Sequence, residues 1–391
     1  MSNLLIKNAR AVTYSGVIGP TDVFIDNGRI VSLDNTDLKA ENVIDAGGDY
    51  LLPGFVDIHV HGGGGADFMD ATVDAFETAV KAHLRHGTTT LVPTAMSATE
   101  QDLADFLNCF SSFKKNSAYA DITPGVHLEG PYFSGATAKS GGAQPRDVLR
   151  LPDMDEVDRL LKIAGGSVIR WDAAPELEGS DLFAKKMHEN GIICAMAHSN
   201  ADSVAAQEGI DKGFTHVTHF YNAVTSYHKV DQRPRAGLVE AVYLNPQVTV
   251  ELICDGRHIP RDIVRLALMI KGADKVSAIT DGMRIAGTDM KTGKLGSLKA
   301  GTDVIVDDGV AKLCDFSSFA GSIATMDRCL KVLCCDYGID IVTAAKMLST
   351  TPARLIGADN TGEIKTGFNA DIVLANSEYK VDTVIKNGII L

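Results

Sequence analysis

The sequence predicts an α/β protein: a (β/α)8 barrel of the TIM type with a small β-sandwich domain built from both ends of the chain. Two observations lead to this prediction. In the middle of the chain, apolar runs rich in β-branched residues alternate with amphipathic stretches, the order of a parallel sheet with crossover helices. At both ends, short β-like runs are separated by Gly and Asn turn signals instead. The 391 residues suffice for one large barrel and an accessory domain.

The accessory domain is expected from the two ends of the chain together. Near the start, β-like runs at 4–6, 23–25 and 30–33 surround the turn Asp26-Asn27-Gly28. The same pattern returns near the end, where a run at 367–374 precedes the turn Asn387-Gly388. We therefore predict that residues 1–53 and 355–391 form the small β-sandwich domain, and that residues 54–354 form the barrel.

Eight candidate strands lie in the middle region, and eight is the number that a closed barrel needs. They cover residues 55–61, 89–94, 124–129, 168–173, 192–198, 216–220, 248–254 and 276–280. Helical patterns lie between most of them, for example over 73–86, 154–164 and 261–270. A Gly- and Lys-rich interval at about 288–312 predicts an inserted hairpin region. Barrels of this kind carry their active site at the C-terminal ends of the strands.

Composition excludes several classes of partner. Lys and Arg number 37 against 50 Asp and Glu, a net charge of 37 − 50 = −13, and no basic block could follow a nucleic-acid backbone. No apolar run approaches the length of a bilayer span, so no membrane association is expected. The seven cysteines are scattered without a CxxC pair, and charge appears too early for a signal peptide, which together indicate a cytoplasmic protein.

Ionisable residues gather at the ends of the predicted strands. Because side chains alternate along a strand, the histidines of Asp57-Ile58-His59-Val60-His61 lie on the same face and can reach one ion. The other strand-end residues of this kind are Glu129, His198, His219 and Asp281. Four histidines and two carboxylates thus meet at the same barrel mouth.

Each of these residues has a simpler interpretation when it is taken alone. A lone histidine in an apolar run is usually a hydrogen-bonded core residue, Glu129 could be a solvated turn carboxylate, and Asp281 could cap a helix. Ionisable groups buried together at equivalent positions, however, need something that offsets their desolvation, and a shared divalent ion does this. The joint pattern therefore favours a metal site.

The ligand types narrow the choice of metal and reaction. Imidazole and carboxylate ligands without thiolate suit Zn²⁺ best in this setting, with Fe²⁺ or Mn²⁺ as alternatives, in one or two ions per subunit. A catalytic metal polarises a carbonyl and activates water, which amide hydrolysis requires. Asp281 can accept the proton of that water and return it to the departing amine.

The ordered set of motifs resembles the N-acetylglucosamine-6-phosphate deacetylases of the amidohydrolase superfamily, and the resemblance runs nearly end to end. The motifs are His59-Val60-His61, Leu128-Glu129-Gly130-Pro131, Ala197-His198-Ser199-Asn200, Thr218-His219-Phe220-Tyr221-Asn222-Ala223, Asp255-Gly256-Arg257-His258, Thr280-Asp281-Gly282 and Phe319-Ala320-Gly321-Ser322. The His-x-His element alone marks only the superfamily, whereas the ordered set is specific to these deacetylases.

The resemblance implies roles for the metal ligands and the catalytic groups. Glu129, His198 and His219 match the principal metal ligands of the family. The pair His59 and His61 matches the second-metal ligands that some members have, and Asp281, counted among the metal ligands as well, matches the catalytic acid and base. His258 would hydrogen-bond the substrate near the scissile carbonyl.

The resemblance also implies substrate contacts. Asn222 and Ala223 would offer backbone amides to the sugar phosphate, and either Arg233 or Arg235 would pair with the same phosphate. Gln144 stands where many members have a histidine that touches the sugar, and its amide can still donate and accept hydrogen bonds. Members are usually homodimers with the phosphate-binding arginine near the interface, so a homodimer is expected here.

The implied activity is the hydrolysis of N-acetyl-D-glucosamine 6-phosphate to D-glucosamine 6-phosphate and acetate. Two alternatives stay open: the same reaction on N-acetylgalactosamine 6-phosphate, and a non-catalytic sugar-phosphate sensor. Cyclic-amide hydrolases of the superfamily often bridge their metals with a carbamylated lysine at the end of the fourth strand. The corresponding segment here, residues 167–175, contains no lysine, which disfavours that reaction.

Overall fold

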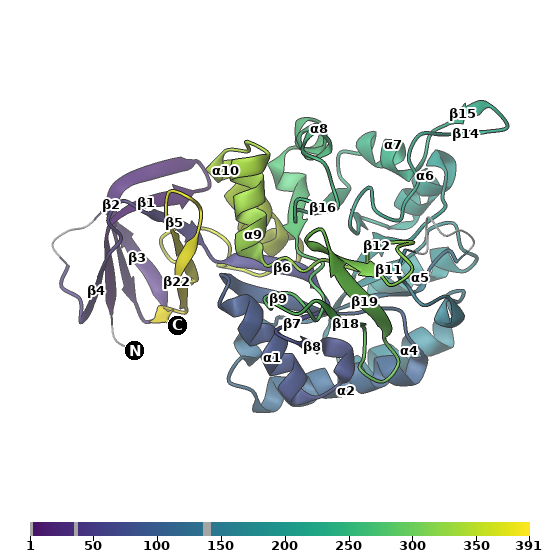
Figure 1. The fold of residues 1–391 in the computed structure, drawn as a ribbon, viewed down its shortest axis with the longest axis horizontal. Coiled ribbons are helices and arrows are strands. Elements are labelled where there is room, and N and C mark those ends of the chain that lie inside the picture. Colours follow the sequence, from purple (N-terminus) through teal and green to yellow (C-terminus); the bar gives the residue numbers. More distant parts are fainter. Residues whose placement is uncertain (1–2, 35–37, 136–141) are drawn as a thin grey trace.

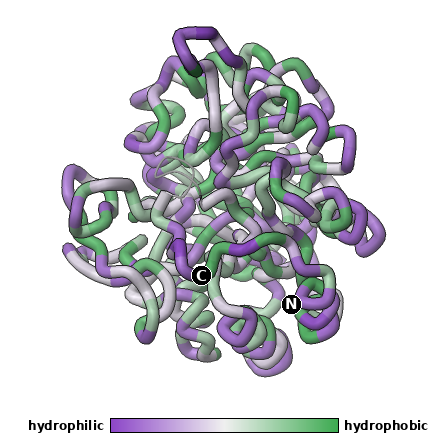
Figure 2. Tube along the Cα trace, turned by 90° about the vertical axis from the view of Figure 1, so that its right-hand side faces the viewer, coloured by the Kyte–Doolittle hydropathy of each residue, from purple (hydrophilic) through white to green (hydrophobic). Residues whose placement is uncertain are grey.

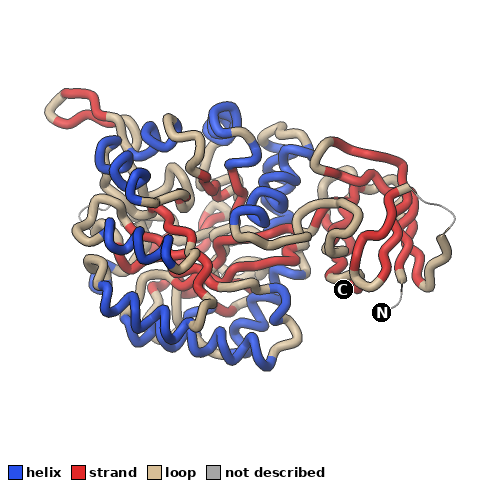
Figure 3. The backbone as a smooth tube through the Cα atoms, turned by 180° about the vertical axis from the view of Figure 1, so that it is seen from behind, coloured by secondary structure: helices blue, strands red, loops and turns tan. Residues whose placement is uncertain are grey.

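The computed structural model describes residues 3–34, 38–135 and 142–391. A barrel of parallel strands surrounded by helices forms the larger part, and a β-sheet built from both ends of the chain lies beside it (Figure 1). Figure 3 shows the same arrangement from behind, with strands in the centre of the barrel and helices around them. The predicted fold class, an eight-stranded α/β barrel with an additional β-domain, is confirmed.

Eight parallel strands form the barrel, in the order β17-β16-β13-β12-β11-β10-β9-β6. Their bounds are β6 (Phe55–Val60), β9 (Thr88–Ala95), β10 (Val126–Tyr132), β11 (Val168–Ala173), β12 (Ile193–Met196), β13 (His216–Val217), β16 (Thr249–Ile253) and β17 (Val276–Ile279). A parallel bridge between Val60 and Gly282 joins the ends of the two outer strands. Across the same seam, the His61 N–H donates to the Gly282 carbonyl at 2.8 Å. The sheet is therefore closed where β6 and β17 end.

The helices follow the strands and cover the outside of the barrel (Figure 3). Their bounds are α1 (Val73–Leu84), α2 (Glu100–Asn116), α4 (Met154–Ala164), α5 (Ser180–Glu189), α6 (Ser203–Lys212), α7 (Leu238–Tyr243), α8 (Arg261–Lys271), α9 (Met326–Lys331), α10 (Ile341–Ala345) and α11 (Thr351–Leu355). Side-chain caps set several of the starts: Thr72, Thr99 and Asp153 each accept hydrogen bonds from the first turn of α1, α2 and α4. The predicted helix at 154–164 has these bounds in the structure.

The sheet beside the barrel joins the two ends of the chain. Its order is β23-β22-β21-β5-β1-β2-β3, and β4 pairs with β1. The bounds are β1 (Leu4–Thr13), β2 (Gly16–Asp26), β3 (Arg29–Leu33), β4 (Asn42–Asp45), β5 (Tyr50–Pro53), β21 (Ile372–Ala375), β22 (Val381–Lys386) and β23 (Ile389–Ile390). The division into residues 1–53 with 355–391 and 54–354 stays a proposal about where the domains meet.

Three small sheets complete the fold. A three-stranded antiparallel sheet occupies most of the predicted insertion, with strands β18 (Thr292–Leu295), β19 (Thr302–Asp307) and β20 (Val310–Leu313). A hairpin of β14 (His228–Val230) and β15 (Arg233–Arg235) projects from the body of the molecule (Figures 1 and 3). The short pair β7 (Gly62–Gly63) and β8 (Ala66–Asp67) follows the first barrel strand.

Three hydrophobic clusters lie in the described part of the chain, and two of them are large. The larger one fills the space between barrel and helices and includes Trp171 and Phe183, whose rings meet edge to face at 5.5 Å. The other lies within the terminal sheet and includes Ile25, Leu51 and Ile372. Figure 2 shows hydrophobic segments along the interior trace and hydrophilic ones at many of the outer turns. Within the described ranges, no helix combines the length and apolar character that a bilayer span requires.

The sixth barrel strand is shorter than predicted. The sequence predicts a strand over 216–220, whereas β13 ends at Val217. His219 and Tyr221 have φ values of 29° and 77°, in the left-handed region that strands do not use. The chain therefore turns immediately after β13, and this turn decides where the side chain of His219 points.

Replacement of Ile372 tests the joint sheet. Ile372 is fully buried and pairs with Pro53 across the contact between the two chain ends. We expect Ile372→Ala to lower the free energy of unfolding by about 2–5 kcal/mol, because it leaves a cavity. Ile390→Ala, at a half-exposed position of the same sheet, is the control and should change it by less than about 0.5 kcal/mol. Urea denaturation followed by circular dichroism measures both, and equal effects would contradict the assignment.

Candidate metal centre and active site

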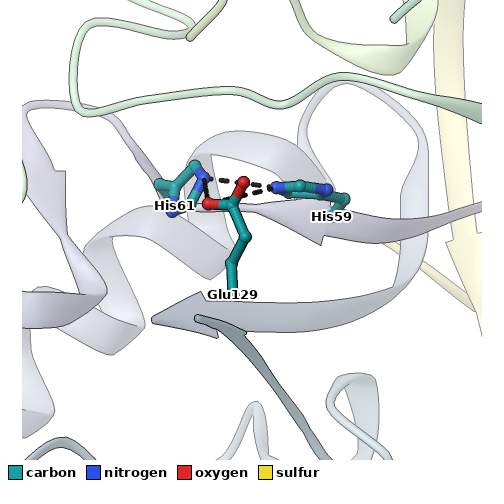
Figure 4. A group of neighbouring side chains, drawn as sticks. All are labelled: His59, His61 and Glu129. Atoms are coloured by element: carbon teal, nitrogen blue, oxygen red, sulfur yellow. Dashed lines mark hydrogen bonds and ion pairs between the residues drawn. The ribbon is translucent and has the colours of Figure 1, made fainter. Parts of the chain in front are cut away.

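The first group of candidate ligands lies where β6 ends. The Nε2 atoms of His59 and His61 are 3.3 Å apart. Oε2 of Glu129, from β10, lies 3.9 Å from the first and 3.3 Å from the second (Figure 4). All three side chains are buried. The alternation expected along the first strand thus brings both imidazoles to the same carboxylate.

The second group shares Glu129 with the first. Oε1 of Glu129 lies 2.9 Å from Nε2 of His198 and 3.0 Å from Nε2 of His219. These two ring nitrogens are 3.1 Å from each other. Each carboxylate oxygen of Glu129 therefore faces a different pair of histidines. The arrangement offers two adjacent cation positions with Glu129 between them.

Asp281 completes the cluster from the other side of the barrel seam. Its Oδ1 lies 3.2 Å from Nε2 of His61 and 3.6 Å from Nε2 of His59. The backbone N–H of Asp281 donates to the carbonyl of His59 at 3.0 Å, so barrel closure positions this residue. Its side chain keeps 11% of its surface exposed, more than Glu129 at 3%. Asp281 is therefore buried and yet open to the pocket.

Backbone strain marks three of the strand-end residues. His198, His219 and Asp281 have φ values of 43°, 29° and 49°. Residues other than glycine seldom adopt this left-handed conformation, and such positions concentrate at functional sites. Each follows its strand within a few residues and turns its side chain into the common cluster.

The electrostatics of the cluster favour a bound cation. Burial works against protonation of His61, but hydrogen bonds and charges of Asp281 and Glu129 raise its pKa well above the usual value. Burial likewise opposes protonation of His219, yet Glu129 raises its pKa to about 9. Burial opposes ionisation of Asp281, and the hydrogen bond from His61 with the nearby histidine charges still holds its pKa below the usual range. The carboxylates thus attract positive charge to the point where the ring nitrogens converge.

The donor set fits a divalent metal ion. Within each group the candidate ligand atoms lie within 4.8 Å of one another, the spacing of atoms around a shared ion. Imidazole nitrogen and carboxylate oxygen without thiolate is a set that Zn²⁺, Fe²⁺ and Mn²⁺ accept. All members are buried, so an ion would also offset their desolvation.

A pocket of about 350 Å³ opens onto the cluster. Its lining includes every site residue predicted from the sequence except His59, Arg233 and Arg235. His59 lies beneath the surface of the pocket and is fully buried. Met96, Leu295 and Phe319 contribute apolar wall that the sequence analysis did not assign to the site.

His258 is held at the pocket by a residue whose role the sequence did not reveal. Nδ1 of His258 lies 2.8 Å from Oδ2 of Asp255, and the other carboxylate oxygen accepts the His258 backbone N–H at 2.9 Å. The ring of Phe319 packs edge to face on the imidazole at 5.0 Å. Because a carboxylate only accepts, Nδ1 carries a proton and Nε2 is left for a ligand. The short spacing of Asp255 and His258 in the sequence is the feature that could have indicated this contact.

Gln144 lines the pocket, but the structure ties its amide to the metal centre. Its Nε2 donates to Oε2 of Glu129 at 2.8 Å, and its Oε1 accepts the backbone N–H of Ser97 at 3.0 Å. The contact with Glu129 was not anticipated.

The two residues predicted to contact the phosphate, Asn222 and Ala223, differ in which of their groups can reach a ligand. The backbone N–H of Asn222 donates to the His219 carbonyl at 2.8 Å, and its predicted contact with a ligand stays a prediction. The side-chain Nδ2 of Asn222 is instead buried with no hydrogen-bond partner in the described part of the chain. Ala223, also at positive φ, lines the pocket. A ligand can therefore meet the Asn222 side chain and the Ala223 backbone.

Arg233 and Arg235 are not brought to the site within this chain. Both lie on β15 of the projecting hairpin, where every residue is exposed (Figure 1). Neither belongs to the pocket lining.

Comparisons with known proteins agree with this site. Residues 50–391 match the model of the amidohydrolase family, and the chain belongs to this family. It is similar to the N-acetylglucosamine-6-phosphate deacetylase of Lysinibacillus sphaericus, with 30% identity over 389 residues that cover 99% of this chain and 97% of the relative. The family resemblance predicted from the motifs is confirmed.

Two further similarities bear on the substrate. The structure of N-acetyl-D-glucosamine-6-phosphate deacetylase from Mycobacterium smegmatis, in complex with N-acetyl-D-glucosamine-6-phosphate, superposes with a TM-score of 0.90 at 29% identity, covering 100% of this chain and 99% of that one. The N-acetylgalactosamine-6-phosphate deacetylase of Escherichia coli O157:H7 is 26% identical over 385 residues, 98% of either chain.

Removal of the shared carboxylate should weaken metal binding. Because Glu129 faces both histidine pairs, we expect Glu129→Gln to lose at least half of the bound metal after dialysis against Zn²⁺ and to lose the rise in melting temperature that Zn²⁺ gives the parent protein. Inductively coupled plasma mass spectrometry and a thermal melt measure the two effects. Glu156→Gln is the control, since Glu156 is also buried but pairs with Arg150. Full metal content in Glu129→Gln would rule out the centre described here.

Proposed function

We propose that this protein is a metal-dependent hydrolase that removes the acetyl group from N-acetyl-D-glucosamine 6-phosphate, giving D-glucosamine 6-phosphate and acetate. The observation that carries the proposal is the position of Asp281, open to the pocket and 3.2 Å from His61 in a cluster suited to divalent metal. The similarity to deacetylases over nearly the full chain supports the choice of substrate.

The metal would be held by Glu129, His198 and His219 at one position and by His59, His61 and Glu129 at the other, with Asp281 beside them. We propose Zn²⁺, with Fe²⁺ or Mn²⁺ as alternatives, and one or two ions per subunit. When bound, the ion supplies Lewis acidity that polarises a carbonyl and makes water more acidic.

Asp281 and His258 would handle the proton and the developing charge. The lowered pKa of Asp281, to which His61 contributes against the effect of burial, keeps its carboxylate ionised at neutral pH and ready to accept a proton from water. The same group then returns the proton to the departing amine, which needs it to leave. His258, fixed by Asp255, hydrogen-bonds the substrate near the scissile carbonyl.

The 6-phosphate would lie at the turn that follows β13. The Asn222 side-chain amide and the Ala223 backbone amide are donors suited to an anion. Gln144, on the pocket wall, would contact the sugar once substrate competes for its amide. The substrate is a small amino sugar phosphate, and neither nucleic acid nor membrane is a proposed partner.

We further propose a homodimer in which the hairpin of one subunit reaches the site of the other. The hairpin projects from the body (Figure 3), and its arginines are exposed and absent from the lining of the pocket. We also propose a cytoplasmic location, in keeping with cysteines that are all free.

Of the two alternatives, one has observations in its favour. The similarity to a galactosamine-specific relative and the presence of Gln144 leave the galacto epimer as a second substrate. A sensor without catalysis would need no proton-transfer group, and the presence of Asp281 in the pocket speaks against it.

Acetate release with the Asp281→Asn variant tests the reaction. We expect the Zn²⁺-loaded protein to release acetate from both hexosamine 6-phosphates, with the larger kcat/KM on the gluco substrate. Asp281→Asn should lower kcat by about 10²–10⁴-fold, because it removes the proton acceptor. The control Asp308→Asn alters an exposed carboxylate outside the pocket lining and should leave the rate unchanged. Faster turnover of the galacto substrate would favour the alternative epimer, and tight binding without acetate release would favour the sensor.

Alanine substitutions on the hairpin test the phosphate contact. We expect either Arg233→Ala or Arg235→Ala to raise KM about 10–100-fold with little change in kcat, because charged hydrogen bonds to phosphate are worth about 1.5–3 kcal/mol and bind ground and transition states alike. Lys229→Ala, on the facing strand, is the control.

If the arginine acts across the dimer, a mixture distinguishes it. Asp281→Asn protein mixed with the arginine variant should regain sites of normal KM, since mixed dimers combine an intact catalytic aspartate with an intact hairpin. No recovery in a mixture shown by native mass spectrometry to contain mixed dimers would contradict the exchange.

A further inference from the structure

Beneath the pocket lies a layer of buried polar side chains that contact the metal centre from below. It consists of Glu251 on β16, Arg170 and Asp172 on β11, and His216 on β13, together with Thr218. None belongs to the pocket lining, so none meets substrate directly. The catalytic proposal above uses none of them.

Glu251 is the member that touches the candidate ligands. Its Oε1 lies 2.7 Å from Nδ1 of His59 and accepts the backbone N–H of His219 at 3.2 Å. Its Oε2 faces Nη1 of Arg170 at 2.5 Å, and Nε2 of His216 lies 3.3 Å away. One carboxylate therefore connects residues from four barrel strands.

The contact fixes the protonation pattern of the His59 ring. Glu251 sits between Arg170 and the histidines, and it forms a fully buried ion pair with the Arg170 guanidinium at 2.5 Å, the partner expected of an ionised carboxylate. An ionised carboxylate only accepts hydrogen bonds, so Nδ1 of His59 must donate. In the neutral ring, the lone pair is then on Nε2, the atom that faces His61 and Glu129.

The position of Glu251 is itself fixed from behind. Arg170 donates to both carboxylate oxygens, and Nε of Arg170 is bound in turn by Asp172 at 3.1 Å. The carboxylate thus cannot rotate away from His59 without breaking a buried ion pair. By contrast, the ring of His219 is oriented separately, through Nδ1 and the carbonyl of Asn222 at 3.1 Å.

We propose that Glu251 is a positioning residue that prepares His59 to bind an ion, and that it determines the affinity of the cation position formed by His59, His61 and Glu129. The position formed by Glu129, His198 and His219 does not depend on it to the same degree. This inference rests on the proposed metal-dependent function but concerns metal occupancy, which is measured without substrate.

Replacement of the carboxylate by an amide tests the proposal. Arg170 donates to both carboxylate oxygens, so the amide nitrogen of Glu251→Gln opposes one Arg170 N–H in either orientation. We expect the amide oxygen to keep the shorter contact, 2.5 Å from Nη1, which places the nitrogen at His59. His59 must then accept at Nδ1 and carry its proton on Nε2, toward the cation position. Losses of metal affinity of about 10–100-fold are typical when such a supporting group is removed. We expect that loss for one of two Zn²⁺ ions, in equilibrium dialysis with mass-spectrometric metal analysis.

Asp172→Asn is the matched control. Asp172 is equally buried and contacts the same Arg170, but it touches none of the candidate ligands. It should retain two ions with parent affinity. An equal loss in both variants would show general damage to the buried layer and would overturn the proposal.

Two further variants separate positioning from folding. Glu251→Asp keeps the charge, but its shorter side chain withdraws the carboxylate from His59. It should therefore also lower the affinity for one of the two ions, and it provides the test if Glu251→Gln does not fold. In a His59→Gln background, Glu251→Gln should cause no additional loss, because its partner is absent. The inference is overturned if Glu251→Gln binds two ions with the affinity of the parent protein. It is also overturned if the parent protein binds only one ion. Acetate release by the parent protein tests the proposed function separately.

Discussion

The closure of the barrel between β6 and β17 is the constraint on which the site depends. Val60 pairs with Gly282 across this seam. The His61 N–H donates to the carbonyl of Gly282 on one side, and the Asp281 N–H donates to the carbonyl of His59 on the other. The end of the last strand is thereby fixed beside the two histidines of the first. Asp281 and His59 are far apart in sequence, and the closure of the barrel is what brings them into contact.

Closure also creates the electrostatic problem that a metal resolves. The assembled groups are buried, and buried ionisable groups need partners. Glu129 is one such partner, because its two oxygens face two pairs of imidazoles. The raised pKa values of His61 and His219, which these carboxylates cause against the effect of burial, show that the cluster attracts more positive charge. Charge balance and candidate catalysis therefore have the same structural origin.

The side chains of the site come from two kinds of backbone, regular strands and strained turns. Regular strands carry Glu129 and His59, whereas His198, His219 and Asp281 occupy left-handed turns just after their strands. Strain of this kind persists only where the surroundings hold the backbone in place. Beneath the cluster, Glu251 is fixed by its ion pair with Arg170 and holds the ring of His59 from the buried side.

The sequence alone determined the fold class, the approximate positions of the barrel strands and half of the residues that line the pocket, among them all of its ionisable ones. Periodicity is a local property: alternation placed His59 and His61 together, and the repeated strand and helix patterns placed Glu129, His198, His219 and Asp281 at one end of a barrel. The expected extent of the sixth strand was too long, because the turn at His219 depends on contacts and not on propensity.

Only the tertiary structure decided the partners that lie far apart in the chain. Gln144 binds Glu129, Glu251 binds His59 across 192 positions, and the arginines of the hairpin stand away from the pocket. Such pairs follow from which strands are neighbours and in what register, and the packing of the whole barrel sets both. A local pattern specifies where a side chain leaves its strand, but the closed sheet specifies what it meets.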